Sequence, residues 1–126
     1  MIRINDPDML RKMDRALRQG GNLYTLEDLG YALEDGKMQS HVANDTWAIT
    51  AVNDFPNKRT VDILYVVGNL EGAFALDKDL EKWANGLGAD AMTAMGRDGW
   101  NRWCSNPGWT KVGTLYSKEL DHGRRR

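Results

Sequence analysis

The sequence holds a single cysteine, two histidines and three prolines among its 126 residues. One cysteine cannot form an internal disulfide or a thiolate metal cage, and it is typical of a chain made in a reducing compartment. The two histidines, His41 and His122, lie at opposite ends of the chain. We therefore expect no metal site. No apolar run is long, since the longest covers only residues 63–67, far too few to cross a bilayer. The first residues also lack the apolar core of a signal peptide, so we expect no membrane contact and a cytoplasmic chain.

An excess of either charge is also lacking, because 17 basic and 18 acidic side chains give a formal net charge of -1. This balance argues against a dedicated nucleic-acid binder. The exception is the end of the chain, where Arg124, Arg125 and Arg126 could contact an anionic surface such as nucleic acid. An apolar content of 41% suits one globular domain, which we place at residues 6–120, followed by a basic tail at 121–126.

Two helices are predicted near the start of the chain. Asp6 and Pro7 are a capping residue and a first-turn proline, and the helix they begin runs to Gly20. Thr25 and Asp28 resemble a capping box, with Asp in place of Glu, for a second helix that ends at Gly36.

The spacing of apolar residues then changes from a helical period to a period of two. We predict strands over residues 46–52, 60–68, 89–95 and 109–120, helices over 76–87 and 97–104, and a loop over 68–73. The first two strands flank a Pro56-Asn57 turn and should form a hairpin. The order α-α-β-β-α-β-α-β contains a strand–helix–strand crossover, which places its strands in parallel. The predicted fold is therefore α/β or α+β with a mixed sheet.

This order resembles the GCN5-related N-acetyltransferase (GNAT) superfamily. Residues 62–67 (DILYVV) look like its central strand, and residues 80–84 (LEKWA) with Gly88 and Ala89 look like its following helix and exit. Gly108-Trp109 and residues 115–120 (LYSKEL) look like its terminal motif. Residues 96–102 (GRDGWNR) also look like small GNAT-like proteins of tailed bacteriophages. The phage resemblance implies a place in the bacterial cytoplasm or in a virion.

The resemblance implies a cofactor, acetyl-CoA, held after the central strand. In the family that loop has the pattern Arg/Gln-x-x-Gly-x-Gly/Ala, whose backbone N–H groups approach the pyrophosphate. The implied cofactor-binding residues here are Val66, Val67, Asn69, Gly72, Ala73 and Phe74. Only Gly72 matches the pattern, and Glu71 adds a charge of the same sign as a phosphate, so the loop is a degenerate version.

The resemblance also implies catalytic groups. The family often has a tyrosine acid four residues before its Gly-aromatic pair, and Cys104 occupies that position. Its thiol could donate a proton to the leaving thiolate, or it could be a buried apolar residue. Glu71 is the candidate general base, with Asp62 and Asp45 further candidates by residue type alone.

A second group of residues suggests contact with a partner. Trp100 lies between Arg97 and Arg102 on the short predicted helix. These side chains could bind an anion or a partner surface, or the ring could fill the helix–sheet interface under the arginine stems.

Three functions therefore stay open at this point. The chain could be an acyl-CoA-dependent N-acyltransferase with a protein acceptor. It could be an inactive GNAT-like phage protein that acts in the virion or binds a host protein. It could also be an interaction domain unrelated to phage. An oligomer is compatible with each.

Overall fold

The computed structural model of the protein describes residues 4–43, 45–95 and 108–121. Helix α1 covers Pro7–Gln19 and begins as predicted, because the Asp6 side chain accepts a hydrogen bond from the N–H of Asp8. Helix α2 covers Leu26–Glu34 and has the predicted capping box, in which Thr25 and Asp28 each bind the other's backbone N–H.

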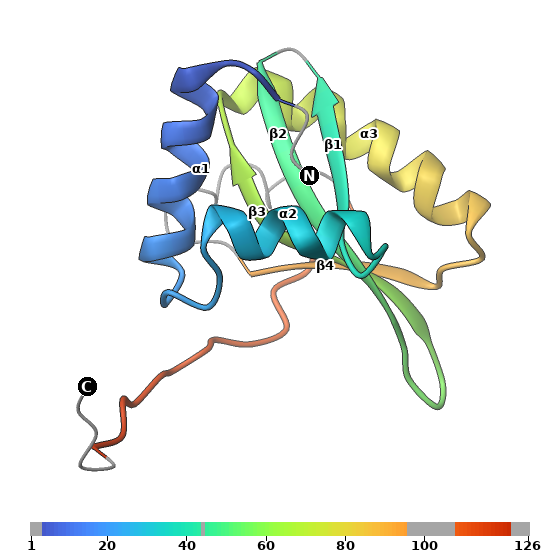
Figure 1. The fold of residues 1–126 in the computed structure, drawn as a ribbon. Coiled ribbons are helices and arrows are strands. Elements are labelled where there is room, and N and C mark those ends of the chain that lie inside the picture. The colour runs from blue at the N-terminus through green and yellow to red at the C-terminus, as the bar shows by residue number, and fades with distance from the viewer. Residues whose placement is uncertain (1–3, 44, 96–107, 122–126) are drawn as a thin grey trace.

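A four-stranded mixed sheet forms the centre of the fold (Figure 1). Its strands, in spatial order, are β1 (Gln39–Ala43), β2 (Thr46–Asp54), β3 (Arg59–Val67) and β4 (Ala91–Ala94). The first three are antiparallel, and helix α3 (Leu70–Gly86) carries the chain across to β4, which is parallel to β3. The predicted hairpin and the predicted crossover are both confirmed, as is the mixed α+β fold class.

The helices cover the two faces of the sheet. Helices α1 and α2 pack on one face over Trp47, Ile49 and Val67, and α3 packs on the other over Ala48 and Ile63 (Figure 1). Each helix turns an apolar stripe to the sheet, and burying these stripes is the main source of stability.

The sequence missed one strand and one helix start. Strand β1 was not predicted, because Gln39, Ser40 and His41 look polar, yet each forms a side-chain hydrogen bond with a residue of β2. Helix α3 begins at Leu70, so the predicted loop over residues 68–73 is wrong beyond Asn69, which caps the helix.

The predicted last strand is also wrong, because residues 108–121 contain no strand or helix. A strand needs a neighbour to accept and donate its backbone hydrogen bonds, and this segment pairs with none in the part of the chain that the structure describes. The predicted helix over residues 97–104 lies outside the described residues.

Candidate functional site

Strands β3 and β4 separate at one end of the sheet. Their parallel pairing begins at Thr60 with Ala91 and stops at Ile63 with Ala94, while β3 continues to Val67. The separation coincides with a β-bulge, because Ile63 and Tyr65 pair with adjacent residues of β2 and Leu64 between them is left out. A bulge bends a strand and increases its twist. The last four residues of β3, 64–67, therefore have no strand beside them on the β4 side among the described residues.

Glycine is required where this free end of β3 leads into α3. Gly68 has a φ of +124°, and a Cβ there would lie 2.3 Å from the carbonyl oxygen of Asp45 and 2.7 Å from the Cα of Thr46. The Thr46 hydroxyl also donates to the carbonyl oxygen of Asn69 at 3.2 Å. These contacts fix the path of the chain between the strand and the helix.

The first turn of α3 offers backbone N–H groups next to this free strand end. Asn69 is the N-cap, and its side-chain oxygen accepts from the N–H of Gly72 at 2.6 Å. The helix has no acceptor for the N–H groups of Leu70 and Glu71. The positive end of the helix dipole adds to these donors, so the turn is suited to an anion.

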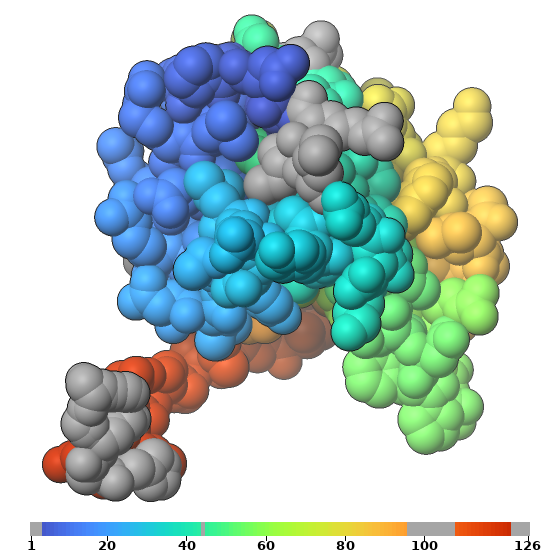
Figure 2. Space-filling model, in the orientation of Figure 1, coloured from blue at the N-terminus to red at the C-terminus, as the bar shows by residue number. Residues whose placement is uncertain are grey.

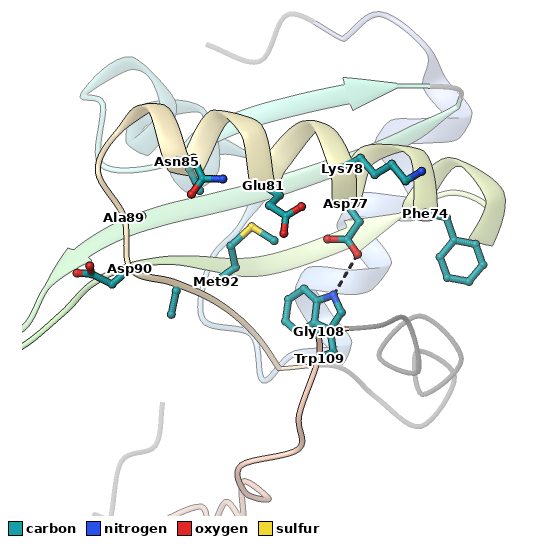
Figure 3. A pocket seen from close by; sticks show the side chains of 12 residues that line it. Phe74, Asp77, Lys78, Glu81, Asn85, Ala89, Asp90, Met92, Gly108 and Trp109 are labelled. Carbon is teal, nitrogen blue, oxygen red and sulfur yellow. Dashed lines mark hydrogen bonds between the residues drawn. The ribbon is translucent and has the colours of Figure 1, made fainter.

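A groove of about 860 Å³ runs along α3 above β4 (Figure 3). Figure 3 shows Phe74 at one end of the groove and Asp90 at the other. Trp109 lies below the helix, and its indole N–H donates to the Asp77 carboxylate at 3.0 Å. Phe74 thus lines the α3 groove, and Gly72 is buried inside the first turn of the helix.

The structure brings most of the predicted cofactor residues together. Val66, Val67, Asn69, Gly72, Ala73 and Phe74 lie at the junction of β3 with α3. Their side chains point in different directions. Val66 packs on the α3 side of the sheet and Val67 on the α1–α2 side, and Ala73 is buried on the face of α3 that packs against the sheet. The groups that all of these residues could offer to one ligand are therefore backbone N–H and C=O groups.

The candidate bases lie in different places. Glu71 is exposed in the first turn of α3, and Asp45 lies in the β1–β2 turn against Gly68. Asp62 lies near the other end of β3, where Asn53 and Thr93 both donate hydrogen bonds to its carboxylate. Cys104, Arg97, Trp100 and Arg102 lie outside the described residues, as do the three terminal arginines.

Two polar groups of the described fold, Tyr65 and His41, were not among the residues predicted to bind a ligand or to react. Burial, and to a smaller extent the nearby Tyr24, raises the pKa of Tyr65, whose ring lies against the C-terminal end of α1 near Gly20. Burial lowers the pKa of His41, whose Nε2 lies 2.9 Å from the Thr50 hydroxyl and whose ring meets Trp83 edge-on at 4.5 Å. In the sequence, Tyr65 stands out only because its hydroxyl is the one polar side-chain group in the apolar run of residues 63–67.

Neither a metal site nor a membrane span is found among the described residues. No three His, Cys, Asp or Glu side chains within residues 4–43, 45–95 and 108–121 are grouped to hold a metal ion. None of the described helices is both long and apolar enough to cross a membrane.

No protein-family model matches the sequence, and no curated protein matches it. Solved structures do match. One is a probable acetyltransferase with 12% identity and a TM-score of 0.63, over 94% of this chain and 95% of that one. The fold is GNAT-like. An aminoglycoside N-acetyltransferase solved with CoA matches at 12% identity and a TM-score of 0.62, over 92% of this chain and 91% of that one. A ribosomal-protein-alanine N-acetyltransferase from Brucella melitensis matches at 11% identity and a TM-score of 0.51, over 86% and 94%. At these identities the GNAT-like fold is what the chain shares with these enzymes.

Proposed function

We propose that this GNAT-like chain is an acyl-CoA-dependent N-acyltransferase with a degenerate phosphate loop. The observation that supports the proposal is the junction at Gly68. There a strand end with no strand on its β4 side among the described residues runs directly into a helix start, whose first N–H groups have no acceptor within the helix. An elongated ligand with amides at one end and phosphates at the other fits this order of donors and acceptors. When bound, the cofactor would supply an acyl group activated as a thioester.

Backbone groups have the main binding role in this proposal. The free edge of β3 at residues 64–67 would align the amide-containing arm, as a neighbouring strand would. The N–H groups of Leu70 and Glu71 would face the phosphates. The Asn69 side chain is already engaged in capping α3, so we assign it to holding the turn.

The acceptor in this proposal is an amine, and a protein amine is the class we favour. Glu71 is the proposed base, since it is the acidic residue in the first turn of α3. Cys104 remains the proposed acid, and Tyr65 is a second proton-bearing group at the free strand end. Arg97, Trp100 and Arg102 remain candidates for contact with the acceptor.

One observation favours the alternative of an inactive GNAT-like phage protein that binds another protein. Residues 68–72 contain no basic side chain, and their one charged side chain is the carboxylate of Glu71. The alternative therefore predicts no binding of CoA.

The test is isothermal titration of the full chain with acetyl-CoA and with CoA. The variant is Leu70→Pro, which removes one proposed N–H donor at a helix position that accepts proline. The backbone before it is extended, with φ -103° and ψ 162° at Asn69, so proline fits without distortion. A hydrogen bond to a charged group contributes about 1.5–3 kcal/mol, so we expect binding to weaken about tenfold or more.

Leu26→Pro is the matched control, because Leu26 is the first residue of α2 and is likewise partly buried against a core cluster. It should leave the Kd for CoA unchanged. Absence of binding at millimolar cofactor would contradict the acyltransferase and support the inactive protein. Equal binding by wild type and Leu70→Pro would contradict the assignment of the site to the start of α3.

A further inference from the structure

The α3 groove has more acidic than basic side chains on its walls. Among the described residues that line it, Asp77, Glu81 and Asp90 carry carboxylates and Lys78 alone carries an ammonium. Figure 3 shows Asp77 and Glu81 pointing from α3 toward β4, while Lys78 extends along the helix. Glu81 is exposed, and the Asp90 carboxylate accepts a hydrogen bond from the backbone N–H of Arg59 at 2.9 Å. The excess of negative charge suits a cationic ligand.

An aromatic ring lies next to these carboxylates. Trp109 is half-buried, and its indole N–H donates to Asp77 at 3.0 Å, which holds the ring at the groove. Phe74 and Met92 add further apolar surface. A guanidinium can lie on an aromatic face while its N–H groups bind a carboxylate, whereas an ammonium is a compact, strongly hydrated charge. A carboxylate beside an aromatic ring therefore favours arginine over lysine.

The groove has the length of a short extended peptide. Phe74 and Asn85 both line it and are eleven positions apart on α3. At about 1.5 Å per helical residue they are about 16 Å apart along the axis, which is the length of about five residues of an extended chain. Asp77 and Glu81 are one turn apart, about 6 Å along the helix, close to the spacing of about 6.6 Å between alternate side chains of an extended peptide. An arginine at every second position would thus meet both carboxylates.

We propose that the α3 groove binds an arginine-containing segment of another protein in an extended conformation. Alternate arginines would meet Asp77 and Glu81, and one guanidinium would lie on the ring of Trp109. The site uses neither the first-turn N–H groups of α3 nor the free end of β3. The proposal therefore goes beyond the proposed acyltransferase and does not depend on it, because binding of CoA and binding of the peptide are separate measurements.

The test is fluorescence polarisation of the full chain with a labelled seven-residue peptide in which arginine and serine alternate. We expect saturable binding of this peptide, and no binding of a peptide with glutamine in place of each arginine. A peptide with lysine in place of each arginine should bind about fivefold more weakly. The reason is that an ammonium stacks less well on an aromatic ring and cannot bind a carboxylate through two parallel N–H groups.

Matched charge changes on α3 locate the binding surface. Glu81→Lys should weaken binding of the arginine peptide about fivefold or more, because it removes an attraction and adds a repulsion. Asp79→Lys makes the same change of charge on the same helix, but Asp79 is exposed outside the groove, so the affinity should stay unchanged. Lys78→Gln should tighten binding about two- to fivefold, since it removes a cation from the groove. Lys82→Gln, outside the groove, should have no effect.

The indole N–H resonance of Trp109 gives a second, independent readout by NMR. It is assigned as the resonance that is lost in Trp109→Phe, and it should shift as the arginine peptide is added. The indole resonance of Trp83, whose ring meets His41 between α3 and β1, should not move.

Several results would overturn the proposal. These are the absence of saturable binding, equal binding of the glutamine or lysine peptide, and equal losses in Glu81→Lys and Asp79→Lys, which would show a general effect of charge. Substitution of Arg124, Arg125 and Arg126 by glutamine in the full chain tests another occupant. Peptide binding that becomes about tenfold tighter in this variant would place the chain's own arginines in the groove and would overturn the assignment to a partner protein.

Discussion

Replacing Gly68 by alanine should destabilise the protein more than any ordinary surface change. The φ of +124° is a conformation that residues with a Cβ rarely adopt, and holding alanine there costs about 1–3 kcal/mol. The added Cβ would also lie 2.3 Å from the Asp45 carbonyl oxygen, which is backbone and cannot rotate away. Such overpacking costs about another 1–3 kcal/mol. Together these amount to about 2–6 kcal/mol, a large part of a typical stability of about 5–15 kcal/mol.

Urea unfolding measures this directly, as a lower midpoint with an unchanged slope. Gly86→Ala is the matched control, because a Cβ at Gly86 meets nothing within 4 Å. Alanine is also favoured over glycine in a helix by about 0.5–1 kcal/mol, so this control should stabilise the protein slightly. Opposite signs for the two substitutions are the expected result. A Gly68→Ala variant as stable as wild type would refute the close packing of the β3–α3 junction against the β1–β2 turn.

Two further results are expected. Burial lowers the pKa of His41 in the folded protein below its value near 6.5 in the unfolded chain, so the unfolded chain binds more protons and stability should fall as pH is lowered from 7 toward 5. Urea unfolding of His41→Gln should show less of this fall, and an identical pH dependence would contradict the prediction. Glu71→Gln removes a carboxylate from the first turn of α3 and should tighten CoA binding about two- to fivefold, as measured by titration. Glu81→Gln, later on the same helix, should leave the affinity unchanged, and weaker binding by Glu71→Gln would show that the carboxylate does not repel the ligand.

Local chemistry was enough to predict several elements of the fold. Asp6 with Pro7, and Thr25 with Asp28, satisfy orphan N–H groups within their own turn, so the starts of α1 and α2 depend on little beyond neighbouring residues. The start of α3 had a comparable sign, since Asn69 is a preferred capping residue. The glycine at position 72 made the same stretch look like a loop.

Long-range pairing explains what the sequence did not reveal. Strand β1 depends on His41 and Gln39 meeting Thr50 of the next strand, which no local pattern specifies. The bulge at Leu64 depends on the register of β3 with β2, and its sequence has no glycine or proline to mark it. Residues 109–120 have the alternation of a strand, but a strand also needs a neighbour, and none pairs with them in the part of the chain that the structure describes.

The weak sequence signal at the β3–α3 junction has a physical explanation in this structure. The groups that we assign to ligand binding are backbone N–H and C=O groups, which are present whatever the side chains are. Only Gly68, which must avoid a Cβ, and a capping residue such as Asn69 are tied to particular side chains. A phosphate-binding loop can therefore lose most of the residues of its sequence motif while its backbone N–H donors stay in place. For this reason titration with CoA, rather than the loop sequence, decides between the acyltransferase and the inactive alternative.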